Sequence, residues 1–108
     1  MPVTSLSVPT PQPGELKLPA ANTWTQLRTT SKPCSKVRLS APTPNSPNGQ
    51  PNAKSILICE STTMPATTAG TWELPSTATG LNYSLVSDAN LIWCYALSAG
   101  DAVEFSIQ

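Results

Sequence analysis

Hydrophobic and polar residues alternate with a period of two in the clearest patterned segments of the chain. In segments 37–41 and 103–107 every second residue is apolar, and the residues between them are charged or carry a hydroxyl group. This period is typical of strands with one buried face and one exposed face. It does not fit the 3.6-residue period of a helix, and no helix-length amphipathic segment is present.

Two other segments are continuously apolar and have the length of strands. Segment 55–60 reads Ser-Ile-Leu-Ile-Cys-Glu, and segment 91–97 reads Leu-Ile-Trp-Cys-Tyr-Ala-Leu. The second is rich in β-branched and aromatic residues, so it is predicted to be the central strand, with Trp93 in the core. Weaker strand signals cover segments 23–29, 71–74 and 83–86.

Polar segments with proline or glycine separate the predicted strands and indicate turns, at 30–33, 42–51, 65–70 and 98–101. Segment 98–101 is predicted to form a tight hairpin turn with Gly100 at positive φ. About seven short strands at this spacing predict an all-β fold. We expect a single small antiparallel β-sandwich or jelly-roll-like domain.

The N-terminal segment differs in composition, with five prolines in residues 1–22. Proline fixes φ and restricts the residue before it, so this segment is predicted to be extended or irregular. We therefore expect an extended, Pro-rich N-terminal arm at 1–22 and a β-sandwich domain at 23–108. The arm is interpreted either as a mobile tail or as a segment that docks its apolar residues on a partner. Those candidate partner-binding residues are Leu6, Val8, Leu16 and Leu18.

Composition and charge exclude several classes of function. The chain has 6 basic and 6 acidic residues, and serine (13), threonine (14) and proline (12) make up 39 of its 108 residues. No basic patch is available to neutralise nucleic acid phosphates, so no nucleic acid partner is expected. No apolar segment approaches the roughly 20 residues of a membrane-spanning helix, so no membrane partner is expected. The first residues also lack the pattern of a secretion signal, which predicts synthesis in the cytoplasm.

The side chains available for catalysis or metal binding are few. With no histidine in the chain, Ser-His-Asp and Cys-His catalysis and histidine-ligated metals are excluded. Cys34, Cys59 and Cys94 are spaced by 25 and 35 residues, unlike the close pairs of zinc sites. We interpret them as buried structural thiols, although a Cys34–Cys59 or Cys59–Cys94 disulfide stays open. No cofactor or metal is expected.

Carboxylates and tryptophans are the remaining candidates for a site. The acidic residues considered as a possible catalytic pair fall at strand ends, turns or outward strand positions, and they are Glu60, Glu73, Asp88, Asp101 and Glu104. Six acids balanced by six bases indicate a solvated surface, so the chain is not expected to be an enzyme. Trp24 and Trp72 lie in weak strands, where core or interface packing is favoured over sugar stacking; both are candidate partner-binding residues.

Four segments together resemble the small β-sandwich domains of tailed-bacteriophage virion proteins. One reads Thr-Gln-Leu-Arg-Thr-Thr-Ser-Lys-Pro-Cys-Ser-Lys-Val-Arg-Leu-Ser-Ala-Pro-Thr-Pro-Asn over 25–45, and it is followed by Ile-Leu-Ile-Cys at 56–59 and Trp-Glu-Leu-Pro at 72–75. The last, 88–105, ends in Tyr-Ala-Leu-Ser-Ala-Gly-Asp-Ala-Val-Glu-Phe. The chain departs from the family pattern at Cys59-Glu60, where a glycine is typical.

The resemblance implies a structural role without an active site. It implies a capsid decoration (cement) protein, or a head or tail accessory protein, on the capsid surface of a virion assembled in the bacterial cytoplasm. The implied partner is the major capsid protein or another virion protein, and a homo-trimer is favoured because icosahedral lattices offer threefold positions. The alternative is a receptor- or carbohydrate-binding module of a tail appendage or cell-surface protein, which an exposed tryptophan pair would favour.

Overall fold

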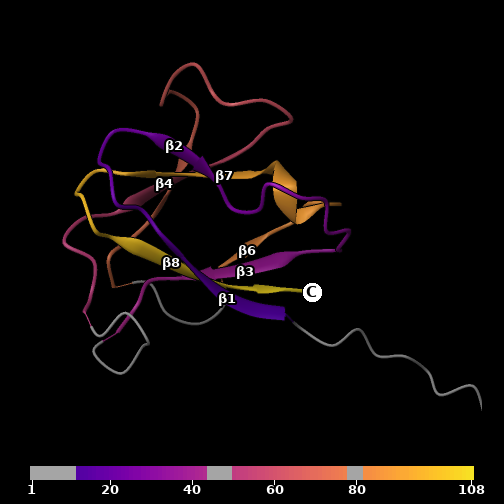
Figure 1. The fold of residues 1–108 in the computed structure, drawn as a ribbon, viewed down its shortest axis with the longest axis horizontal. Helices are drawn as coiled ribbons and strands as arrows, with labels where there is room; N and C mark the ends of the chain where they lie inside the picture. Colours follow the sequence, from indigo (N-terminus) through magenta and orange to yellow (C-terminus); the bar gives the residue numbers. More distant parts are fainter. Residues whose placement is uncertain (1–11, 44–49, 78–81) are drawn as a thin grey trace, which may run out of the picture.

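Two antiparallel sheets of four strands each face one another in the computed structural model, which describes residues 12–43, 50–77 and 82–108 (Figure 1). Sheet A consists, in spatial order, of β1 (Gln12–Lys17), β8 (Ala102–Ile107), β3 (Val37–Ser40) and β6 (Tyr83–Ser84). Sheet B consists of β2 (Trp24–Gln26), β7 (Ile92–Ala96), β4 (Ile56–Glu60) and β5 (Trp72–Leu74). The predicted all-β sandwich is confirmed, and the predicted central strand is β7, paired on both sides.

The core lies between the two sheets and follows the alternation of the strands. In β3 the residues Val37 and Leu39 are fully buried, whereas Arg38 between them is exposed. In β7 the buried residues are Ile92, Cys94 and Ala96, although that segment is continuously apolar in sequence. Trp93 therefore points away from the core, and its expected place in the core is wrong because it has the opposite parity in the strand.

The N-terminal arm expected at residues 1–22 is partly wrong. Residues 12–17 form β1, which pairs along its whole length with β8. Leu18 follows and is 1% exposed within the core. Pro13 is tolerated in this strand because β1 is at the edge of sheet A, where one side needs no partner. Residues 1–11, with Leu6 and Val8, lie outside the described residues.

Gly14 leaves room on β1 for the ring of Phe105 from the neighbouring strand β8. A β-carbon built at Gly14 would lie 2.5 Å from the ring of Phe105, which is shorter than any normal contact. Phe105 stands directly opposite Gly14 in the β1–β8 register. The aromatic ring therefore occupies the space that a side chain at residue 14 would need.

The connections of the sandwich run mainly from one sheet to the other. Within the described part of the chain, β4 and β5 are the one pair of strands adjacent in both sequence and sheet. The turn at 98–101 has Gly100 at φ 88° as predicted, but it joins β7 of sheet B to β8 of sheet A. It is not the predicted hairpin. Instead it pairs with Leu18, whose backbone N–H donates to Asp101 O (2.9 Å) and whose carbonyl accepts from Gly100 N (2.9 Å).

The one helical element in the described ranges is a short 3-10 turn, Ala89–Leu91, ahead of β7. Among these residues no helix has the length and apolar character to cross a membrane.

Candidate functional site: the outer face of sheet B

The outer face of sheet B is apolar where the outer face of a two-sheet sandwich is usually polar. We use the name outer face of sheet B for the outward residues of its strands, which are Trp24, Gln26, Leu57, Cys59, Glu73, Trp93 and Tyr95. Trp24 stands opposite Tyr95 in the β2–β7 register, and Leu57 stands opposite Tyr95 in the β4–β7 register. Directly opposed residues share one face, so these three side chains form a row across three strands.

A second row runs beside the first. Gln26 of β2 and Cys59 of β4 both stand opposite Trp93. Every residue of the two rows is half-buried. The face is therefore neither a covered core nor a solvated surface.

Two polar side chains of this face form hydrogen bonds within the molecule. Trp93 Nε1 donates to Ser61 O at 3.0 Å, and the Gln26 side-chain amide donates to Asn90 O. Glu73, opposite Leu57 at the margin of the sheet, is exposed. The face therefore offers mainly aromatic and aliphatic contact area.

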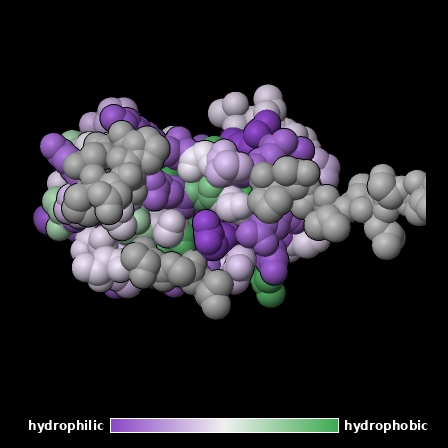
Figure 2. All heavy atoms as spheres, turned by 90° about the horizontal axis from the view of Figure 1, so that it is seen from below, coloured by the Kyte–Doolittle hydropathy of each residue, from purple (hydrophilic) through white to green (hydrophobic). Residues whose placement is uncertain are grey.

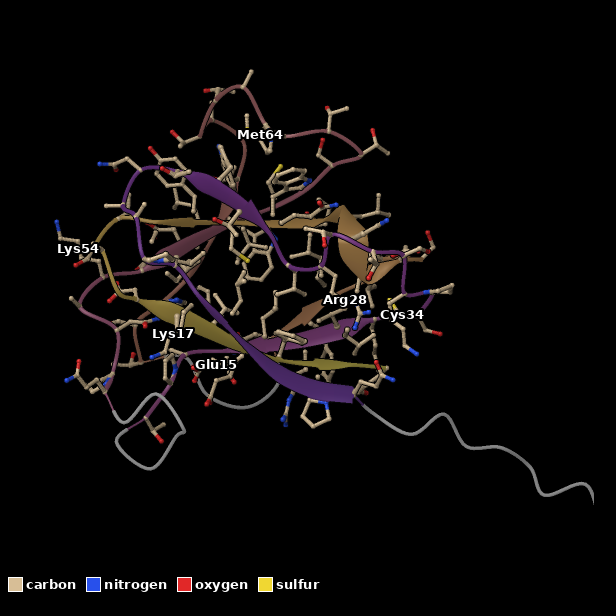
Figure 3. All side chains as sticks on the ribbon, in the orientation of Figure 1. Glu15, Lys17, Arg28, Cys34, Lys54 and Met64 are labelled. Atoms are coloured by element: carbon tan, nitrogen blue, oxygen red, sulfur yellow. The ribbon has the colours of Figure 1, made fainter. Side chains whose placement is uncertain are left out.

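The aromatic rings of the first row lie close to each other. The ring centroids of Trp24 and Tyr95 are 5.0 Å apart, and their planes are tilted by 57°. This separation and tilt are in the favourable range for aromatic pairs. The connection between β4 and β5 rises on the same side of the sheet (Figure 1) and carries Met64, which is 62% exposed (Figure 3).

The outer face of sheet A has a different character. Glu15 of β1 and Ser40 of β3 both stand opposite Glu104 of β8. Together with Arg38 and Phe105 they line a hollow of about 380 Å³, and Figure 2 shows hydrophilic side chains around a small apolar floor on this side. Glu15 Oε2 is shielded from solvent and has no hydrogen-bond partner among the described residues.

Leu16 and Leu18 are not available to a partner, which corrects their prediction as docking residues. Leu18 lies in the core of its own domain, and Leu16 packs against that core from β1. Both belong to the sandwich because residues 12–17 pair with β8. The apolar residues of a predicted arm therefore complete sheet A instead.

The two candidate tryptophans lie on different sides of sheet B. Trp24 belongs to its outer face, while Trp72 is half-buried and packs against the core from the edge strand β5. Trp72 Nε1 donates to Glu60 Oε1 at 3.2 Å, and the same oxygen accepts a hydrogen bond from Ser84 of sheet A. Glu60 thus ties the open edges of both sheets together, so the structure does not bring Trp24 and Trp72 into one site.

Two other acidic side chains also stabilise connections. Asp101 is buried and accepts from the backbone N–H groups of Ala53 (2.9 Å) and Lys54 (3.1 Å). Asp88 accepts from the Ser31 hydroxyl and from the backbone N–H groups of Lys32 and Asn90. The Ser31 hydrogen bond, followed by those two N–H groups, lowers the pKa of Asp88. Both carboxylates hold loops in place.

All three cysteines are free. Cys59 and Cys94 lie on adjacent strands, but Cys59 faces outward and Cys94 faces the core. A disulfide between them is therefore excluded by the alternation of the strands. Burial raises the pKa of Cys94 to about 12, and burial followed by the negative charge of Asp88 raises the pKa of Cys34. In the described part of the chain no group of three or more potential ligands is placed to hold a metal.

Sequence reasoning missed Leu57, Trp93 and Tyr95 as members of a surface. The signal is present in segment 92–96, where small or β-branched residues at one parity alternate with aromatic residues at the other. Because both sets are apolar, the pattern predicts a central strand with Trp93 in the core.

Comparison of the chain with protein-family models, with curated proteins and with solved structures found no match. The candidate site is thus defined by the chemistry of the outer face of sheet B.

Proposed function

We propose that this chain is a non-enzymatic structural protein of a tailed-phage virion. In this proposal it is a capsid decoration protein that stabilises contacts between major capsid subunits. The observation that carries the proposal is the largely apolar outer face of sheet B. Half-buried aromatic and aliphatic side chains in register across three strands match the aromatic-rich, charge-poor composition of protein contact surfaces.

The character of the remaining surface supports attachment without steering by charge. Charged residues make up only 11% of the chain, and on the outer face of sheet B the charged residue is Glu73, at the margin. Short serine, threonine and proline side chains lose little conformational entropy when they are covered by a partner. Attachment should therefore depend on apolar burial and should be insensitive to salt.

The test uses phage particles assembled without this chain, to which purified protein is added back. Trp24→Ser removes a large side chain from the outer face of sheet B, and Arg38→Gln changes an outward residue of sheet A as the matched control. We expect Trp24→Ser to lower occupancy by roughly tenfold or more, because one large buried aromatic contributes at least that much to affinity. Equal occupancy of the two variants would overturn the proposal.

A receptor- or carbohydrate-binding module is the second candidate. It is favoured by one observation, the Trp24–Tyr95 ring pair with Glu73 at its margin. Sugar recognition also requires several polar groups beside the aromatic rings, and the Gln26 amide already donates to a backbone carbonyl. A titration with soluble oligosaccharides decides between the two candidate functions. The change in tryptophan fluorescence is measured in wild type and in Trp24→Ser. Saturable binding that Trp24→Ser abolishes would favour the sugar-binding function.

A further inference from the structure

The strand β1 is the longest edge strand among the described residues. It has 6 residues, whereas the other edge strands, β2, β5 and β6, have 3, 3 and 2. Leu18, directly after β1, turns both its N–H and its carbonyl toward the turn at 98–101. These groups alternate in direction along an antiparallel pair. Pro13, Glu15 and Lys17 therefore direct theirs away from β8, toward the open edge of sheet A.

The backbone groups at this edge can accept an added strand. The N–H groups of Glu15 and Lys17 have no hydrogen-bond partner among the described residues. Pro13 has no N–H, which is why it is tolerated at an edge-directed position. The next edge-directed residue beyond Lys17 is Pro19. Prolines on both sides therefore limit full backbone pairing to the segment 15–17.

The side chains of this segment carry opposite charges on one face. Glu15 and Lys17 are two residues apart on β1 (Figure 3), so both side chains belong to the outer face of sheet A. Within its own chain Glu15 stands opposite another carboxylate, Glu104, and its Oε2 has no hydrogen-bond partner among the described residues. A lysine from a neighbouring strand would supply the missing positive charge.

The same segment of a second copy supplies that lysine. When two β1 strands run antiparallel with Leu16 at the twofold axis, Glu15 of each copy stands opposite Lys17 of the other. Opposite charges at directly opposed positions are favourable. A register centred on Glu15 would instead bring two carboxylates together. Charge complementarity therefore selects one register, and that register also aligns the unpaired N–H groups with unpaired carbonyls.

We propose that two copies of this chain associate edge to edge through β1, so that sheet A continues from one copy into the other. Each Glu15 N–H donates to the carbonyl of the partner's Lys17, and each Lys17 N–H donates to the carbonyl of the partner's Glu15. Charged residues and proline usually protect an edge from such pairing, but here the charges match and Pro13 lies outside the bonded pairs. The contact goes beyond the proposed function, because no residue of β1 belongs to the outer face of sheet B.

The test is charge reversal in the full chain, with molar mass measured by sedimentation from low micromolar to millimolar concentration. Wild type should shift from one copy to two as the concentration rises. Glu15→Lys and Lys17→Glu should each weaken association by roughly tenfold or more, because each variant places like charges opposite one another at both pairs. An equimolar mixture of the two variants should associate again, since every pair then joins a lysine to a glutamate.

Glu73→Lys is the matched control, because it reverses an exposed charge on the edge strand β5 of sheet B. It should associate like wild type. A single copy of wild type at every concentration, a trimer, or a mixture of the two β1 variants that stays as light as each variant alone would each overturn the inference.

Amide hydrogen exchange of wild type, followed by NMR, tests the register without any variant. The amides of Glu15 and Lys17 should exchange quickly in dilute protein and become protected at high concentration. The amide of Leu16, directed toward β8, should be protected at both concentrations. Exchange of Glu15 and Lys17 that does not depend on concentration would show that this edge is not the contact.

Discussion

The outer faces of the two sheets differ in chemistry although each sheet has four strands and the same antiparallel pairing. Sheet A presents Glu15, Arg38, Ser40 and Glu104 around a hollow. Sheet B presents a row of aromatic and aliphatic side chains. Both sheets contribute buried apolar residues to the core, so the inner positions specify the fold and the outer positions distinguish one surface from the other.

Each outer face also has its own unfavourable contribution to the free energy of the folded protein. On sheet A the carboxylates of Glu15 and Glu104 are direct cross-strand neighbours, which is unfavourable for like charges. On sheet B the half-exposed aromatic side chains keep apolar surface in contact with water. A partner can remove the second cost by covering the face, which is why sheet B is the candidate for binding.

Removal of β1 gives the largest expected effect. Deletion of residues 1–21 removes the edge strand of sheet A and the buried Leu18, so cooperative unfolding should be lost. Deletion of residues 1–11 leaves every described contact of sheet A in place, and this variant should melt like the full chain in circular dichroism. Cooperative melting of the 1–21 deletion near the full-chain temperature would show that β1 is dispensable.

Thiol labelling compares the inner and outer faces of sheet B directly. Cys94 should react about 10³-fold or more slowly than Cys59 in the dilute native protein, because its exposure requires unfolding. Mass spectrometry of alkylated peptides measures the alkylation rates of the two cysteines, and equal rates would contradict the assigned strand parity.

Burial raises the pKa of Cys94 to about 12. Above the ordinary thiol pKa this thiol ionises in the unfolded chain but stays protonated in the native protein. The free energy of unfolding should therefore fall as pH rises through that range.

Paired substitutions on β3 compare the inner and outer faces of sheet A. Leu39→Ala should cost about 2–5 kcal/mol of unfolding free energy, because Leu39 is fully buried and its truncation leaves a cavity. Arg38→Gln at the next, exposed residue should stay within about 0.5 kcal/mol of wild type. Urea denaturation measures both, and similar losses would mean that the two faces of β3 are assigned incorrectly.

Gly14→Ala tests the close packing of β1 on sheet A. The added methyl group meets the ring of Phe105, so a loss of about 1–3 kcal/mol is expected. Combining it with Phe105→Leu should recover part of that loss, since the smaller side chain frees the space. Strictly additive losses in the double variant would indicate that the ring does not cause the effect.

Glu104→Gln should give the smallest effect and the opposite sign. Removal of one charge from the Glu15–Glu104 pair is expected to stabilise the protein by about 0.2–1 kcal/mol. The gain should shrink at high salt, which screens the repulsion in wild type. Glu73→Gln at the margin of sheet B, with no acidic residue opposite it, is the control and should change stability little in the same thermal melts.

Local side-chain order was enough to predict the class of fold and most of its strands. The period of two in segments 37–41 and 103–107, and the apolar segments around β4 and β7, depend on local side-chain order, which the chain carries without its tertiary structure. The positive φ of Gly100 was predictable for the same reason. The virion role, the partner and the arm-docking of Leu6 and Val8 stay predictions.

How these strands combine into two sheets depends on contacts that local sequence does not specify. Residues 12–18 fall within the predicted proline-rich arm because nothing near them in sequence shows that they pair. Their partner strand, β8, lies more than 80 residues away in sequence. The sequence predicts a hairpin at 98–101 because a short turn joins two strands there. Local sequence does not show that the two strands belong to different sheets. The sequence predicts Trp93 in the core because both parities of β7 are apolar. The position of sheet A is what shows which of the two parities is buried. Each of these outcomes depends on contacts between distant segments, and hydrophobic periodicity records the presence of a buried face without recording what buries it.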